Sequence, residues 1–128
     1  MKRIAFITTV LALLFFANIS RALCQSITGA WCGSILGSRI EVTLVQNDQM
    51  FEGIANLTDI MGTQSTYHVV GAVFGNAING LHGSGHTFAG QLVNPDIIKG
   101  TLTLKSGRQF DLELERVHAA TVSQHSNS

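Results

Sequence analysis

Two histidines, His82 and His86, flank a Gly-Ser-Gly turn and are the side chains of this sequence best suited to bind a ligand or a metal ion. If that turn joins two paired strands, the imidazoles become cross-strand neighbours, and Tyr67 falls on the same predicted face. A metal site needs at least one further ligand, for which Tyr67 and Asp59 are the candidates. We favour histidines at the rim of a pocket over a metal site.

Other groups that could carry a reaction lack partners. Ser34, Ser38 and Ser84 have no histidine and acid placed to activate them, and no paired carboxylates fall on the predicted inner face. The formal net charge is zero and 12% of the residues are charged, so the chain has no electrostatic footprint for nucleic acid or an anionic membrane. We therefore expect a protein that is not an enzyme and uses no cofactor.

Period-two alternation of apolar and polar residues recurs between residues 27 and 117, whereas helical spacing is hard to find. In RQFDLELER, for example, Phe110, Leu112 and Leu114 share one face and the acidic residues share the other. Turns rich in Gly, Asn and Pro separate such runs. The pattern predicts eight strands, near residues 28–36, 39–46, 49–57, 66–74, 77–82, 86–93, 97–105 and 109–117.

Turn lengths can be tested against the faces of these strands, because a slip of one residue would exchange core for solvent. Two-residue turns at 37–38, 47–48 and 75–76, and three-residue turns at 83–85 and 106–108, keep one apolar face continuous. That inner face comprises Trp31, Ile35, Ile40, Val42, Leu44, Phe51, Leu57, Tyr67, Val69, Val73, Ile78, Phe88, Leu92, Ile98, Leu102, Leu104, Phe110, Leu112 and Leu114. Such strands are best closed into an all-β, antiparallel up-and-down barrel, because closure removes both sheet edges.

The sequence allows two interpretations of the barrel interior, a filled core or a ligand cavity. An eight-stranded barrel is wide enough for side chains alone or for one small ligand, and the inward glycines could ease curvature or leave space. A ligand pocket requires a cavity of about 300 Å³ or more. A core packed solid by Phe51, Phe88 and Phe110 would exclude it. The longest predicted loop, 58–66, is a candidate lid, with Ile60 and Met61 as apolar contacts.

The two ends of the chain differ from the barrel region. Lys2 and Arg3 precede an apolar run and small residues, which predicts a secretory signal peptide over 1–24, cleaved after Ala22 or after Cys24. If both Cys24 and Cys32 remain, an oxidising compartment would allow them to form a disulfide. The barrel would then span 25–117, followed by a polar, disordered tail over 118–128. We expect a secreted or periplasmic protein without membrane attachment after cleavage.

Trp31 on the first predicted strand and Arg116 at the inward end of the last should meet at one end of the barrel. A guanidinium over an indole face contributes about 0.5–2 kcal/mol. This pairing resembles that of the calycin superfamily, to which the lipocalins and avidins belong. The resemblance implies that Trp31 and Arg116 form the closed foot of the barrel.

Longer stretches resemble the avidin and streptavidin family. SITGAWCGSILGSRIEV is similar to the first strand and hairpin of these proteins, HTFAGQLV to their sixth strand, and GTLTLKSG to their seventh. The biotin contacts transfer poorly: Ser38 matches the serine of the Leu-Gly-Ser turn, but Gly33 replaces an asparagine, and the tryptophans fall on Leu81, Phe88 and Leu102. Because each buried unpaired polar group costs about 1–3 kcal/mol, the resemblance implies a ligand other than biotin.

Two functions follow from these observations. The first is a secreted barrel for a small apolar ligand, with candidate binding residues Ser38, Tyr67, His82, His86, Phe88, Leu102 and Phe110. The second is a secreted protein that acts through its surface on an extracellular protein, for example as an enzyme inhibitor, with a filled barrel. The family resemblance also implies a homo-oligomer, for which Val45, Val70, Phe74 and Leu81 offer outward apolar side chains.

Overall fold

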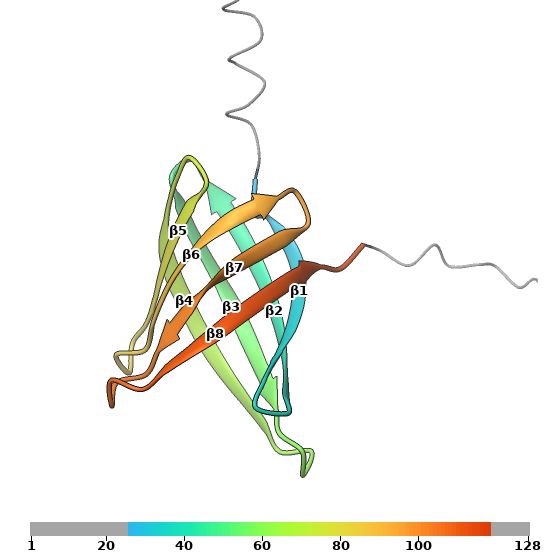
Figure 1. Ribbon diagram of the computed structural model, residues 1–128. Helices are drawn as coiled ribbons and strands as arrows, with labels where there is room; N and C mark the ends of the chain where they lie inside the picture. The colour runs from blue at the N-terminus through green and yellow to red at the C-terminus, as the bar shows by residue number, and fades with distance from the viewer. Residues whose placement is uncertain (1–25, 119–128) are drawn as a thin grey trace, which may run out of the picture.

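The computed structural model describes residues 26–118 (Figure 1). The predicted signal peptide over 1–24, Cys24 and residues 119–128 of the predicted tail lie outside this range. His118, the first residue of that tail, has a defined position, with its Nε2 3.0 Å from Oδ1 of Asp96. No helix long and apolar enough to cross a membrane occurs within the range described.

Eight antiparallel strands form a closed barrel in which each strand pairs with its neighbours in the sequence and the last pairs with the first. Their bounds are β1 Gly29–Ile35, β2 Ser38–Asn47, β3 Met50–Thr58, β4 Gln64–Phe74, β5 Ala77–His82, β6 Thr87–Asn94, β7 Ile97–Thr103 and β8 Gln109–Arg116. The predicted fold class is confirmed, and the strand ends agree within two residues. The predicted loop over 58–66 was too long, because β4 begins at Gln64 and leaves only residues 59–63 between the strands.

The register confirms some of the predicted turns and corrects others. The turns at 75–76 and 83–85 are as predicted, with Val73 opposite Ile78 and Gly80 opposite Phe88. The other three predicted turns are each displaced by one residue. Two lie closer to the N-terminus than predicted, at 36–37 and 105–107, and one lies closer to the C-terminus, at 48–49. Moving a turn by one residue changes the pairing by two positions, so the side chains keep their faces.

Backbone conformation explains where these turns lie. Leu36 and Gly37 both have positive φ, 49° and 81°. A two-residue hairpin loop of this type requires positive φ at both positions to match the twist of its strands, and glycine is favoured in the second position. In the three-residue hairpin over 105–107, Gly107 is third, with φ 90°, just as Gly85 is third in the hairpin over 83–85, with φ 98°. Glycine is favoured there because the third residue adopts the left-handed conformation.

The barrel interior is formed by the predicted face. Every residue predicted to point inward is buried or half-buried, and the fully buried side chains include Trp31 and Ile98. Ile27, just before β1, is also fully buried, although it was absent from the predicted inner face. It accompanies Trp31, whose indole Nε1 donates a hydrogen bond to the carbonyl of Ile27 at 2.9 Å.

Arg116 closes the end of the barrel at which Trp31 lies. Its guanidinium carbon is 4.3 Å from the centre of the Trp31 ring. Its three nitrogens donate hydrogen bonds to the carbonyls of Thr28, Ser26 and Pro95 at 2.7, 2.9 and 3.0 Å. One side chain thus connects the entry segment, the hairpin between β6 and β7, and β8, and closes this end of the barrel.

Candidate functional site

A cavity of about 200 Å³ lies inside the barrel, between the closed foot and the opposite end. Nearly all of its wall is apolar, and side chains from all eight strands contribute to it. Its polar members are Tyr67, His82, His86 and Thr87. The rest of the wall consists of Ile35, Ile40, Val42, Leu44, Phe51, Ala55, Leu57, Val69, Ile78, Gly80, Leu81, Phe88, Ile98, Leu102, Leu104, Leu112 and Leu114.

Two phenylalanine rings set the size of this cavity. The ring of Phe51 lies where a side chain on Gly71 would be, and the ring of Phe88 lies over Gly90 and Gly100. A Cβ atom added at Gly100 would be 2.5 Å from the Phe88 ring, and one at Gly90 would be 2.7 Å from it. The inward glycines therefore make room for aromatic rings, and the space that remains, about 200 Å³, falls short of the roughly 300 Å³ stated above as the requirement for a ligand pocket.

The volume still suits a ligand, although a smaller one than expected. A cavity of about 150 Å³ lined by Leu, Ile and Phe stays free of water and binds benzene. A cavity of about 200 Å³ with a similar lining can hold a slightly larger apolar group. The barrel is therefore not packed solid, and its cavity has room only for a compact molecule.

The mouth of the cavity is formed by the aromatic cluster of Tyr67, His82 and His86, all three half-buried. The two imidazole rings are stacked, with centroids 5.8 Å apart and planes 13° apart. Tyr67 meets both rings edge-on, at centroid distances of 5.1 and 6.3 Å. The hairpin between β5 and β6 holds the histidines in this position, because the amide of His82 donates to the carbonyl of His86 at 2.9 Å.

The structure brings together five of the seven predicted ligand-binding residues: Tyr67, His82, His86, Phe88 and Leu102 line the cavity. Ser38 and Phe110 are not part of its wall. Ser38 is opposite Ile35 in the hairpin between β1 and β2. Arg108 lies over the face of the Phe110 ring, with its guanidinium carbon 5.1 Å from the ring centre.

The sequence-based prediction missed several wall residues. Ile35, Leu57, Val69 and Leu104 were placed on the inner face but not at the site, because alternation defines the face of a residue and not its depth in the barrel. Ala55 was not placed on the inner face at all, although it lies opposite Tyr67. Its small size among larger neighbours is the signal that could have identified open space beside it.

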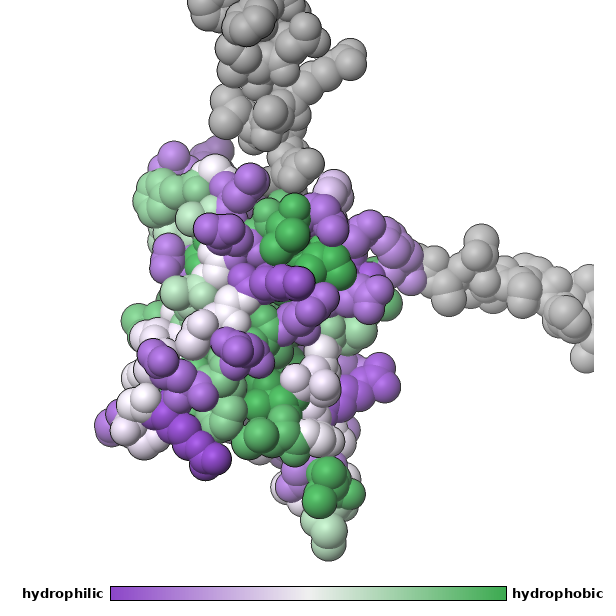
Figure 2. Space-filling model, viewed as in Figure 1, coloured by the Kyte–Doolittle hydropathy of each residue, from purple (hydrophilic) through white to green (hydrophobic). Residues whose placement is uncertain are grey.

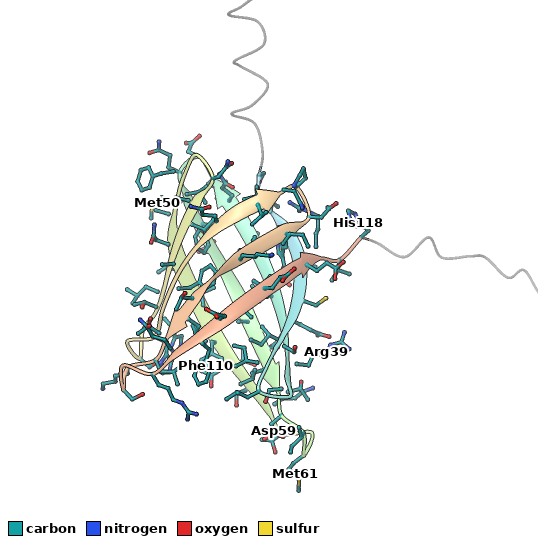
Figure 3. The ribbon with its side chains drawn as sticks, in the orientation of Figure 1. Arg39, Met50, Asp59, Met61, Phe110 and His118 are labelled. Carbon is teal, nitrogen blue, oxygen red and sulfur yellow. The ribbon has the colours of Figure 1, made fainter. Side chains whose placement is uncertain are left out.

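The loop over 59–63 does not cover the mouth with apolar side chains as a lid would. Oδ1 of Asp59 accepts hydrogen bonds from the amides of Met61 and Thr63, each at 2.9 Å, which makes the loop a compact turn. Ile60 and Met61 are 81% and 86% exposed and are absent from the cavity wall. Figure 3 shows Met61 at the tip of this loop, directed away from the barrel, and Figure 2 shows the hydrophobic tip.

Neither metal ligation nor a disulfide is seen in the described part of the chain. Within residues 26–118, no three His, Cys, Asp or Glu side chains converge on one point. Cys32 is half-buried in β1 and has no second cysteine near it among these residues. The side chains present at the mouth offer hydrogen bonding and aromatic contact.

Comparisons with models of protein families and with curated proteins found no match to this chain.

Proposed function

We propose that this chain is a secreted barrel of the avidin type that binds one compact, largely apolar molecule other than biotin. The cavity of about 200 Å³ is the observation that carries the proposal. Burial of apolar surface contributes about 25 cal/mol per Å², and a cavity with few polar groups offers little to water. An apolar ligand is thus favoured over the solvent that it would replace.

The distribution of polar side chains argues against biotin. Tyr67, His82, His86 and Thr87 all lie at the mouth, so the depth of the cavity offers no polar side chain. The ureido group of biotin needs several convergent hydrogen-bonding partners, and each partner that is missing in a buried position costs about 1–3 kcal/mol. A hydrocarbon body in the depth of the cavity, with any polar group at the mouth, fits this distribution better.

The outer surface supports association of the barrel with copies of itself. One cross-strand row on the outside of β2 to β5 contains Val45, Glu52, Val70 and Leu81. Leu81 is 49% exposed on this surface and also borders the cavity near its mouth. Each of these apolar side chains is about half exposed, as is Phe74 near the end of β4. An apolar patch of this kind is typical of interaction surfaces, and we include a homo-oligomer in the proposal.

Native mass spectrometry of the secreted protein is the experiment that tests the function. We expect a small-molecule adduct that is lost on unfolding. The Ala55→Leu variant should lose it, because the added carbons project into the cavity, whereas Ala89→Leu on the exposed face of β6 should retain it. A bare wild-type chain that also fails to take up compact hydrocarbons would contradict the proposal.

A second function, binding of an extracellular protein through the surface, is favoured by a different observation. Leu36, Ile60 and Met61 are at least 74% exposed and lie on the two neighbouring hairpin tips, β1–β2 and β3–β4. Leu36 also holds a positive φ of 49°, which is unfavourable for leucine. Apolar tips of this kind could enter a pocket of a partner, and a chain without any ligand would direct the search to such partners.

A further inference from the structure

The protonation pattern of His82 is determined by its own hairpin. The backbone amide of Ser84 donates a hydrogen bond to Nδ1 of His82 at 3.2 Å, and the Ser84 hydroxyl oxygen lies 2.6 Å from the same nitrogen. A backbone N–H can only donate, so Nδ1 must present a lone pair. In the neutral ring the proton is therefore on Nε2.

His86 is held in the same tautomer by a different hairpin. The backbone amide of Lys105, between β7 and β8, donates a hydrogen bond to Nδ1 of His86 at 3.1 Å. This hairpin is itself closed by the amide of Leu104, which donates to the carbonyl of Arg108 at 2.8 Å. Two separate backbone segments thus leave an Nε2–H donor on each ring.

These two donors are free for a ligand. Neither Nε2 atom has a hydrogen-bond partner among residues 26–118, and both rings are part of the cavity wall. The two rings are stacked, with centroids 5.8 Å apart, so both donors belong to one compact cluster at the mouth. Tyr67, whose ring contacts both imidazoles, carries a hydroxyl that can add a third hydrogen bond.

One hairpin at the mouth carries two basic side chains, although residues 26–118 as a whole contain more acidic than basic residues. All eight Asp and Glu residues lie within 26–118, but Lys2, Arg3 and Arg21 of the eight basic residues precede it. The hairpin beside His86 nevertheless carries Lys105 and Arg108. The acidic group in the loop between β3 and β4 is Asp59, whose Oδ1 is occupied by two backbone amides.

We propose that the ligand of this barrel is a compact apolar carboxylic acid, whose carboxylate accepts hydrogen bonds from Nε2–H of His82 and His86 while its hydrocarbon body occupies the cavity. This inference rests on the proposed ligand-binding function and names the ligand class. A carboxylate is an acceptor at every lone pair, which complements a mouth of donors. The positive charge of Lys105 and Arg108 adds to the attraction. An amine would present donors to donors.

Three probes of one shape separate this inference from the function on which it rests: cyclohexanecarboxylate, methylcyclohexane and cyclohexylmethylamine. We expect the acid to bind the full mature chain at least tenfold more tightly than the hydrocarbon, because two hydrogen bonds to a charged acceptor form, and the amine to bind most weakly. Equal affinity for acid and hydrocarbon would overturn the inference and leave the function intact. If none of the three probes binds, both the inferred ligand class and the proposed ligand-binding function are contradicted.

Variants locate the effect at the two rings. His82→Phe and His86→Phe retain an aromatic ring and remove the donor, so each should lower the affinity for the acid several-fold and by clearly more than it changes the affinity for methylcyclohexane. His68→Phe, on the exposed face of β4, should change neither. Long-range ¹H–¹⁵N NMR spectra of the imidazoles of the wild-type protein give a check that needs no variant. We expect the Nε2–H tautomer for His82 and His86, and the Nδ1–H tautomer in either would contradict the inference.

Discussion

Replacement of Arg116 by methionine should be the most damaging single change at the closed foot of the barrel. The side chain is 19% exposed and donates three hydrogen bonds to carbonyls of Thr28, Ser26 and Pro95. Methionine keeps the length of the side chain and removes every donor. It also removes the charge that lies 4.3 Å from the centre of the Trp31 ring.

The magnitude follows from these contacts. The carbonyls belong to exposed residues and would regain water. We therefore take about 1 kcal/mol for each hydrogen bond, which is less than the roughly 1.5–3 kcal/mol typical of hydrogen bonds to charged groups. The stack on Trp31 adds about 1 kcal/mol. The sum, about 4 kcal/mol, is a large part of the roughly 5–15 kcal/mol that stabilises a domain. Arg116→Lys, which keeps the charge and loses the planar fork, should lose about half as much.

Urea unfolding followed by far-ultraviolet circular dichroism measures this loss without depending on the altered Trp31 environment. Arg39→Met is the matched control, because Arg39 is exposed and its pair with Glu41 at 3.0 Å should contribute less than about 1 kcal/mol. A cycle with Trp31→Phe should give a coupling of about 0.5–2 kcal/mol. The reasoning is refuted if Arg116→Met costs no more free energy of unfolding than Arg39→Met.

Three further predictions concern the packing, the loop and the outer surface. Gly71→Ala should lower the free energy of unfolding by about 1–3 kcal/mol, because the new methyl group overlaps the Phe51 ring. Gly83→Ala is the control: nothing lies within 4 Å of its new carbon, so the change should be less than about 0.5 kcal/mol. If thermal unfolding ranks the two variants otherwise, the close packing of Phe51 against Gly71 is contradicted. Asp59→Ala should accelerate hydrogen exchange at the amide of Thr63 and cost less than about 1 kcal/mol globally, so unchanged exchange would show that the carboxylate does not hold the turn. Val70→Asp should shift the protein to monomers in light scattering, and an oligomer that persists would place the interface elsewhere.

Much of the fold could be predicted from the alternation of residues along the strands. The clearest case is β8, where Leu112 and Leu114 alternate with acidic residues and are both buried. The registers of the strand pairs could be predicted less well, because a shift of two positions keeps every side chain on its face. The position of Gly107 could have corrected one of them, since glycine is favoured in the third place of a three-residue hairpin, as Gly85 shows.

The candidate site was predictable in part for the same reason. Tyr67, His82 and His86 were placed together because each lies on the inner face beside a turn at one end of the barrel. Ser38 and Phe110 were not found in the cavity wall, since their depth and direction depend on the tilt of strands and on neighbours such as Arg108. The alternation of apolar and polar residues carries no information on the depth of a side chain in the barrel or on its direction.

The sequence by itself determined most of the side chains that face the interior, the number of strands that close the barrel and several of the residues that gather at its two ends. These properties depend on local periodicity and turn chemistry, which act over a few residues. The tertiary structure alone decided the volume of the cavity, because the Phe51 and Phe88 rings occupy space over glycines of other strands. It also decided the tautomers of His82 and His86, because the amide that holds His86 comes from a hairpin distant in the chain.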